Sequence, residues 1–302
     1  MANISSLSPS YQGDKHVPLR NLFWRRAVRR VLRDRLTLMA LFGVIVLVLL
    51  CVIGPPILEQ ALNINPNRTA VTDRYLPPNP AHPLGTDSVG RDQLVRLLYG
   101  GRVSLAIATV GSLLTISIGV LSGLAAGYYG GWVDAVLRWI ISTLESIPVF
   151  FLLIVVTTIW SPSPETLVVL VAFLGWSATA RLVRGEVLSL RERDFVLAAR
   201  ALGAPNWRIM LTHLLPNLFP IIIVALTINA GSLILVESGL SFLGLGVQPP
   251  TPTWGNMLTD ARANFYRGTY LIIWPGIMIA LTVLSFYLVG DGLRDALDPR
   301  RQ

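Results

Sequence analysis

Charge, histidine and cysteine are all scarce in this sequence, and each scarcity excludes a class of protein. Only 14% of the 302 residues are charged, against about a quarter in a typical soluble domain, which disfavours a soluble globular fold. The single cysteine, Cys51, excludes an internal disulfide and a cysteine-based zinc site. The histidines His16, His82 and His213 form no ligand pattern such as His-Glu-x-x-His. We therefore predict no metal site, and we expect Cys51 to be a small buried residue.

Catalytic motifs are also missing. No Gly-x-Ser-x-Gly sequence is present to expose a serine nucleophile. A phosphate-binding P-loop needs a lysine after its glycines, but the only lysine, Lys15, lies in Gln-Gly-Asp-Lys-His without such a loop. We predict that the chain has no catalytic residue and binds no cofactor. If ATP drives its activity, another chain hydrolyses it.

Long apolar runs are what the sequence has in abundance. Hydrophobic residues make up 53% of the chain, and a helix needs about 20 apolar residues to cross a membrane. Six runs come close to that length or exceed it: about 36–58, 103–133, 137–160, 166–180, 214–236 and 268–290. Ser163 and Pro164 suit an N-cap and a first helical residue, which would lengthen the fourth run. We predict an all-α, polytopic membrane protein with six transmembrane helices.

The basic residues predict how these helices are oriented. The net charge is +8, but the arginines flank the apolar runs instead of forming one basic face, so we expect no nucleic-acid partner. Most basic residues fall on one side of the membrane if both termini are cytoplasmic, as the positive-inside rule requires. The basic stretch 23–35 is either an amphipathic helix on the anionic membrane lipid of the inner leaflet or a plain topology anchor.

Three glycines and two carboxylates stand out within the runs. Gly119, Gly123 and Gly127 recur every fourth residue, a spacing that lets another helix approach closely. Glu145 and Glu237 lie in or beside spans, where an unpaired charge is costly. Either carboxylate could line a transport pathway, but we favour neutral or paired residues at helix interfaces.

A polar segment at about 189–216 separates the fourth and fifth runs. Phe195, Ala198, Ala199 and Leu202 follow helical spacing within it. Gly203 is expected to break this helix, Pro205 to start a second short helix, and Pro216 to end it near the membrane. Two short helices joined by a tight turn would form a knob that fits a groove on a partner protein. A solvated linker is the alternative.

Motifs in this segment and elsewhere resemble those of a known family. The pattern Ala198-Ala199-x-x-x-Gly203, with Ala204 and Pro205 after it and Leu-Leu-Pro216 at its end, resembles the EAA loop of binding-protein-dependent ATP-binding-cassette (ABC) permeases. Leu197 departs from the motif, because it stands where the family usually has glutamate.

Three further stretches resemble the C-type subunit of dipeptide and oligopeptide permeases. They are Gly-Thr-Asp-Ser-Val-Gly-Arg-Asp at 85–92, the stretch 241–256 that contains Trp254, and Gly-Asp-Gly-Leu-Arg-Asp-Ala-Leu-Asp-Pro at 290–299. The first supplies six candidate residues of an extracytoplasmic motif: Gly85, Thr86, Asp87, Gly90, Arg91 and Asp92. Asp87 or Ser88 could simply cap a helix leading into the second run.

The resemblance implies a type I, MetI-like permease in the bacterial or archaeal cell (inner) membrane. Its partners would be a second, B-type permease subunit, two ATPase subunits that hold ATP and Mg, and an extracytoplasmic substrate-binding protein. The EAA loop would dock on an ATPase. Residues 101–302 would form a five-helix core, and residues 1–100 an addition of a basic helix, one span and an extracytoplasmic loop. The proline-rich loop 248–254 could shape an outer gate with Trp254, or a docking face, or be merely rigid.

The resemblance makes di- and oligopeptides the leading cargo. The same subunit type also serves nickel, glutathione and oligosaccharide uptake. A proton-coupled secondary transporter acting alone would be expected to show an internal repeat, and we find none that is convincing. A membrane-embedded enzyme is disfavoured by the missing catalytic motifs.

Overall fold

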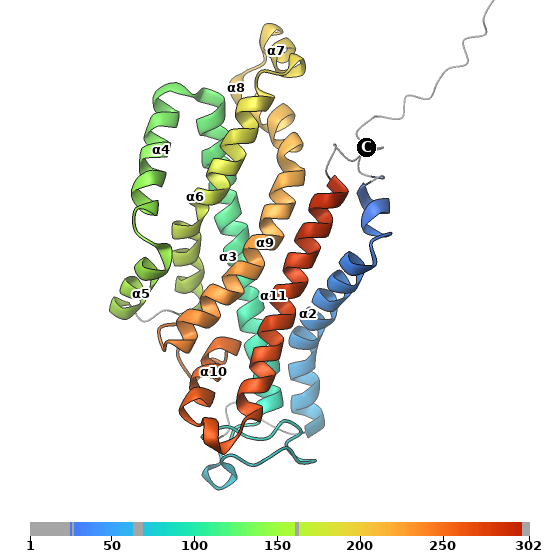
Figure 1. The fold of residues 1–302 in the computed structure, drawn as a ribbon, viewed down its shortest axis with the longest axis vertical. Helices are drawn as coiled ribbons and strands as arrows, with labels where there is room; N and C mark the ends of the chain where they lie inside the picture. Colours follow the sequence, from blue (N-terminus) through green and yellow to red (C-terminus); the bar gives the residue numbers. More distant parts are fainter. Residues whose placement is uncertain (1–24, 26, 63–68, 161–162, 298–302) are drawn as a thin grey trace, which may run out of the picture.

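The fold is a bundle of long helices, which confirms the all-α prediction. We describe it from a computed structural model, for residues 25, 27–62, 69–160 and 163–297. These residues form helices and loops, with one isolated β-bridge between Thr86 and Asp92. The long helices run side by side along the molecule in Figure 1. They are α2 (Arg35–Leu62), α3 (Gln93–Tyr129), α6 (Pro164–Leu190), α9 (Leu215–Phe242) and α11 (Tyr270–Leu297).

The predicted third span is broken. Helices α4 (Gly131–Glu145) and α5 (Val149–Ile159) meet at a bend of 72°. Pro148 lies in this bend and has no backbone N–H to donate within a continuing helix, which explains the break. By length and composition, five described helices can cross a membrane, or six if this bent pair counts as one span.

Two other boundaries differ from the sequence expectation. Helix α3 begins at Gln93, ten residues before the predicted start of its apolar run, and passes residue 101 without a break. Pro216 does not end a helix: it lies in the first turn of α9, and the π-helix η2 (Ile209–Leu214) leads into α9 without a gap. Proline is tolerated there because first-turn N–H groups have no intrahelical partner. The start of α6 at Pro164, with Ser163 as its N-cap, is as predicted.

The three regularly spaced glycines pack α3 against α6. A Cβ added to Gly119 would lie 2.5 Å from Thr179 Cβ, and one added to Gly123 would lie 2.5 Å from the Ala180 carbonyl oxygen. At Gly127 the nearest atom would be Val187 Cβ, 2.7 Å away. Such distances leave no room for a side chain, so the predicted packing role is confirmed. Cys51 is fully buried, also as predicted.

The two ends of the bundle carry different structures. One end carries α7 (Asp194–Ala201) and α8 (Asn206–Arg208), and the start of α2 and the end of α11 lie toward the same end (Figure 1). The other end carries residues 69–92 with η1 (Val71–Asp73), and α10 (Trp254–Ala263) with η3 (Phe265–Arg267). We call these the α7 end and the α10 end. The basic stretch 23–35, interpreted as either a surface helix or a topology anchor, includes residues 23, 24 and 26, which lie outside the described residues.

Candidate functional site

At the α7 end, a tight turn joins two short helices. Gly203 has φ +78°, a backbone conformation that favours glycine, and its N–H donates to the Arg200 carbonyl at 3.0 Å. The Ala204 N–H donates to the Ala199 carbonyl at 3.1 Å. Pro205 then precedes α8 as its N-cap. The predicted helix–turn–helix is therefore present, and we call residues 194–208 the α7–α8 segment.

The residues at helical spacing in α7 do not all lie on its buried face. Val196 and Ala199 are buried in one apolar cluster with Ile209 and Leu214, whereas Phe195 and Leu202 are exposed. With only eight residues, α7 makes about two turns, so two inward side chains are enough to hold it. The apolar positions read from the sequence therefore point outward as well as inward.

Exposed apolar side chains cover the tip of the α7–α8 segment. Leu202 is 88% exposed, Trp207 62% and Leu197 45%. Large apolar groups gathered on a surface commonly mark a contact with another protein. Leu197 stands where the EAA motif usually has glutamate. It lies on this surface and adds one more apolar side chain to it.

The α7–α8 segment is fastened to the end of α3. The hydroxyl of Tyr128 donates to Asn206 Oδ1 at 2.8 Å, and the Arg200 guanidinium lies 5.6 Å from the centre of the Tyr128 ring. The segment is therefore connected to α3 by these contacts and to α9 through η2.

At the α10 end, Asp87 organises a tight loop. Its Oδ1 accepts from the N–H groups of Val89 at 3.0 Å and Arg91 at 2.9 Å. Gly90 has φ +80°, and an added Cβ would lie 1.9 Å from the Ala70 carbonyl oxygen. The predicted cap of α3 by Asp87 or Ser88 is wrong: Asp92 is the N-cap, and its Oδ1 accepts from the Val95 N–H at 2.9 Å. The reason is that Asp87 is used within the loop.

The other residues of the 85–92 motif bond this loop to neighbouring segments of the chain. The second carboxylate oxygen of Asp92 lies 2.9 Å from His82 Nδ1. Thr86 is fully buried, and its hydroxyl accepts from the Leu76 N–H at 2.8 Å. Gly85 has φ +79°, and its carbonyl accepts from the Gln93 N–H at 3.0 Å. All six motif residues thus serve this structure.

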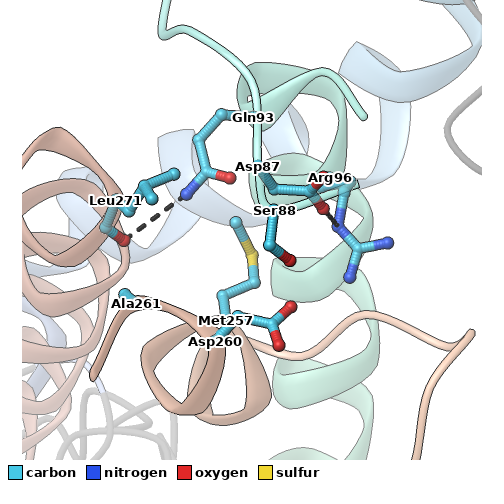
Figure 2. Close-up of a pocket in the computed structure, with 8 residues that line it drawn as sticks. All are labelled: Asp87, Ser88, Gln93, Arg96, Met257, Asp260, Ala261 and Leu271. Carbon is cyan, nitrogen blue, oxygen red and sulfur yellow. Dashed lines mark hydrogen bonds and ion pairs between the residues drawn. The ribbon is translucent and has the colours of Figure 1, made fainter. Parts of the chain in front are cut away.

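Two arginines and two aspartates link this loop to α3 and α10. Arg91 Nε donates to Asp87 Oδ2 at 2.6 Å, and Arg91 Nη2 lies 3.5 Å from Asp260 Oδ2 on α10. Arg96 Nε on α3 lies 3.5 Å from Asp87 Oδ2 (Figure 2). We call these four residues the arginine–aspartate cluster.

One atom of this cluster has no hydrogen-bond partner among the residues that the structure describes. Arg96 is 2% exposed, and its Nη1 is buried without such a bond. The adjoining cavity measures about 10 Å³, close to the space of one water molecule. Burial raises the pKa of Asp260 above its ordinary value, and Arg91 opposes that rise. The cluster is thus suited to holding α3 and α10 together, and its cavity is too small for a peptide.

Glu237 and Trp254 meet at the junction of α3, α9 and α10. The hydroxyls of Ser104 and Ser241 donate to the Glu237 carboxylate at 3.1 and 2.8 Å. Ser104 also accepts from the backbone N–H of Trp254 at 3.2 Å. The Trp254 side chain is fully buried, and its Nε1 donates to the Leu97 carbonyl at 2.9 Å. Both residues are therefore packed inside the junction.

Glu145 lies elsewhere, between α4 and α6. Its carboxylate pairs with Arg181. Nearby, Asp134 of α4 forms a two-bond ion pair with Arg184 of α6. These contacts match the paired interface role that we favoured for Glu145. Among the described residues, no three His, Cys, Asp or Glu side chains gather to hold a metal ion.

Sequence reasoning missed several of these residues. Arg96 contacts Asp87, Ser104 contacts Trp254 and Asp260 contacts Arg91. Each of the three missed residues lies outside the sequence motif to which its partner belongs. Only the charge of Arg96, at the edge of an apolar run, signalled a partner. Ser104 and Asp260 carried no signal of their own.

Comparisons with known proteins give consistent matches. Residues 119–302 match the family described as "Binding-protein-dependent transport system inner membrane component". Residues 23–78 match "N-terminal TM domain of oligopeptide transport permease C".

Similar proteins come from several bacteria. The dipeptide transport system permease protein DppC of Bacillus subtilis is 38% identical over 91% of this chain and 85% of its own length. The oligopeptide transport system permease protein OppC of Haemophilus influenzae is 35% identical over 92% and 88%. The glutathione transport system permease protein GsiD of Pectobacterium atrosepticum is 44% identical over 74% of each chain.

Proposed function

The chain belongs to the family of binding-protein-dependent transport system inner membrane components, and we propose that it is one permease subunit of an ATP-driven importer of di- and oligopeptides. It would form half of the translocation pathway. A B-type permease subunit would form the other half, two ATPase subunits would supply ATP hydrolysis, and an extracytoplasmic binding protein would deliver the cargo.

The observation that carries this proposal is the α7–α8 segment. Its exposed apolar tip, with Leu202 and Trp207, fits a groove on an ATPase, and its ties to α3 and α9 would carry the motion of that ATPase into the bundle. Leu197, Ala198, Ala199, Gly203, Ala204, Pro205 and Pro216 would be its coupling residues. This chain would conduct cargo without catalysing a reaction and would hold neither ATP nor Mg itself.

The membrane topology follows from this assignment. The α7 end would face the cytoplasm, which places the described start of α2 and end of α11 on the cytoplasmic side. The α10 end would face the binding protein. We keep the proposed division into an N-terminal addition, residues 1–100, and a core, residues 101–302, although α3 crosses that boundary as one helix.

Peptide cargo is favoured by the names of the dipeptide and oligopeptide permeases among the relatives. Glutathione is the second candidate because a glutathione permease is 44% identical to this chain. Glutathione is itself a modified tripeptide, so both cargoes share an amide backbone and carboxylates. Nickel and oligosaccharides remain less supported alternatives.

Gentle purification of the tagged chain from its native membrane tests the assembly. We expect two P-loop ATPases and a second permease to copurify, and the complex in proteoliposomes to import peptide only with ATP and the binding protein. A lone chain that transports cargo without ATP would contradict the proposal. Comparing peptides, glutathione, nickel and sugars as stimulants of ATP hydrolysis would identify the cargo.

A further inference from the structure

A small cavity lies where the 85–92 loop, α3, α10 and α11 meet (Figure 2). Its volume of about 10 Å³ is close to the space that one water molecule needs. Peptides, sugars and lipid headgroups are all too large for it, so its occupant is either a water molecule or a small ion. Five polar side chains line the cavity: Asp87, Ser88, Gln93, Arg96 and Asp260.

One of these side chains carries a hydrogen-bond donor that no described residue satisfies. Arg96 is almost fully buried, and its Nη1 has no hydrogen-bond partner among the described residues. The Nε of the same guanidinium lies 3.5 Å from Asp87 Oδ2, so the ion pair with Asp87 is made through a different atom. An arginine N–H group that is buried without an acceptor is costly, because it loses its bonds to water and gains none in the protein. An acceptor is therefore expected at Nη1.

The other polar side chains around the cavity leave room for a bridging molecule. Figure 2 shows Gln93 turned away from Arg96 toward the Leu271 carbonyl, to which Gln93 Nε2 donates at 3.4 Å. Asp260 Oδ2 lies 3.5 Å from Arg91 Nη2, and among the described residues no ion pair joins Asp260 directly to Arg96. A carboxylate has about four acceptor positions, so Asp260 can accept a further hydrogen bond on the cavity side.

The charges around the cavity favour a neutral occupant over an ion. Arg91 and Arg96 balance Asp87 and Asp260, so the arginine–aspartate cluster carries no net charge when all four side chains are charged. A cation at Arg96 Nη1 would be repelled by the guanidinium, and an anion there would be repelled by the Asp260 carboxylate. A water molecule meets both groups favourably because it accepts one hydrogen bond and donates another. The Asp260 side chain is 42% exposed, which gives water a route into the cavity.

We propose that this cavity binds one water molecule, which accepts a hydrogen bond from Arg96 Nη1 and donates one to the Asp260 carboxylate. The Ser88 hydroxyl lines the same cavity and offers the water a third partner. The water links α3 to α10 through two side chains that have no direct bond to each other, and Arg96 is a positioning residue that acts through it. All these groups belong to this chain, so the inference does not depend on the proposed function.

Radiolytic labelling with X-rays detects such a water through Met257. This side chain lines the cavity and is 4% exposed. Hydroxyl radicals formed from a bound water oxidise an adjacent methionine to its sulfoxide, even where bulk solvent does not reach. Met278 of α11, which packs against the apolar core, is the internal control. In the full chain purified in detergent, we expect Met257 to be oxidised several times faster than Met278, and equal rates would overturn the proposal.

A variant that fills the cavity separates bound water from bulk solvent. Ala261 is fully buried and lines the cavity, so the two added methyl groups of Ala261→Val should displace the water. Oxidation of Met257 should then fall to the rate of Met278. Ala106→Val, the same change at an exposed position of α3, should leave the rate of Met257 unaltered. Fast oxidation of Met257 in a folded Ala261→Val chain would mean that bulk solvent reaches the sulfur, which contradicts the proposal.

Two measurements on the unaltered chain complete the test. Labelling should be the same in chloride buffer and in chloride-free gluconate buffer, because oxidation that occurs only without chloride would identify a chloride ion as the occupant. Electron cryomicroscopy should show a density peak about 2.7–3.2 Å from Arg96 Nη1 and from one Asp260 oxygen. A map that resolves other bound waters but shows no peak there would overturn the proposal even if the Ala261→Val chain fails to fold.

Discussion

The two ends of the bundle use their side chains in opposite ways. At the α10 end, polar groups are buried and bonded to one another, as in the arginine–aspartate cluster and around Glu237. At the α7 end, apolar groups are exposed and a short segment is held by few contacts. The α10 end is therefore held together by its own polar contacts, whereas the α7 end presents the apolar surface to which we assign the proposed ATPase contact. Four predictions test this contrast, from the largest expected effect to the smallest.

The largest effect should follow the loss of Asp87. Asp87→Ala leaves Arg91 and Arg96 without their shared carboxylate, and breaking a buried ion pair from one side costs about 3–5 kcal/mol. We expect a much lower yield of folded protein and a lower midpoint in detergent thermal unfolding. Glu192→Ala, which removes the exposed partner of Arg191 at the other end, is the control and should change neither. Equal stability of the two variants would show that the cluster does not hold the α10 end.

Gly203→Pro should impair coupling while leaving the fold intact. Proline cannot adopt the φ of +78° found at this turn, so α7 and α8 would be reoriented. We expect normal membrane insertion and thermal unfolding, continued ATP hydrolysis by the complex, and import reduced by more than about tenfold, as expected when a docking geometry is lost. Import at the level of the unaltered complex would refute the assignment of this turn to coupling.

Removing an exposed side chain from the tip of the α7–α8 segment should weaken binding of the ATPases without lowering the stability of the isolated chain. Trp207→Ala removes a large exposed ring, and such a contact commonly contributes about 1–2 kcal/mol or more to an interface, roughly a tenfold change in affinity. Retention of the ATPases during purification at rising detergent concentration is the measurement. Tyr266→Ala, which removes a fully exposed aromatic ring at the α10 end, should retain the ATPases fully.

The smallest effect concerns pH. Burial raises the pKa of Asp260, so the folded state binds this proton more tightly than the unfolded chain. The charged carboxylate therefore lowers stability above the raised pKa, and the penalty fades as pH falls toward the ordinary value of about 4. Asp260→Asn should flatten the pH dependence of the unfolding midpoint above about pH 4. An unchanged dependence above about pH 4 would mean that Arg91 outweighs burial, because the contribution of Asp260 would then fall below that pH.

Features that depend on a periodic sequence pattern could be predicted more fully than contacts between side chains of distant segments. Apolar runs predicted the spans, and the spacing of Gly119, Gly123 and Gly127 predicted a face of close helix packing, because both depend on the pattern along a single helix. The bend at Pro148 was missed since the apolar composition continues through it. Hydropathy averages over a window and does not register a single absent N–H.

Side-chain partners from distant segments were the least predictable. Asp87 was expected to cap a helix from its neighbours in sequence, but it bonds instead to the loop and to Arg96. The junction of Glu237 depends on Ser104, more than a hundred residues away, and neither residue indicates the other. Similarly, the two turns of α7 were too short for periodicity to fix which face is buried.

The uninterrupted passage from α8 through η2 into α9 has a mechanical consequence. These 37 residues, Asn206–Phe242, form one rod about 55 Å long at the usual helical rise. The rod is held firmly near its far end, where Glu237 bonds to Ser104, roughly 45 Å from Asn206 and 8 Å from Phe242. A rigid tilt of this rod about the Glu237 contact would therefore move Asn206 about six times as far as Phe242, so the proposed coupling would turn a large movement at α8 into a small one at the other end.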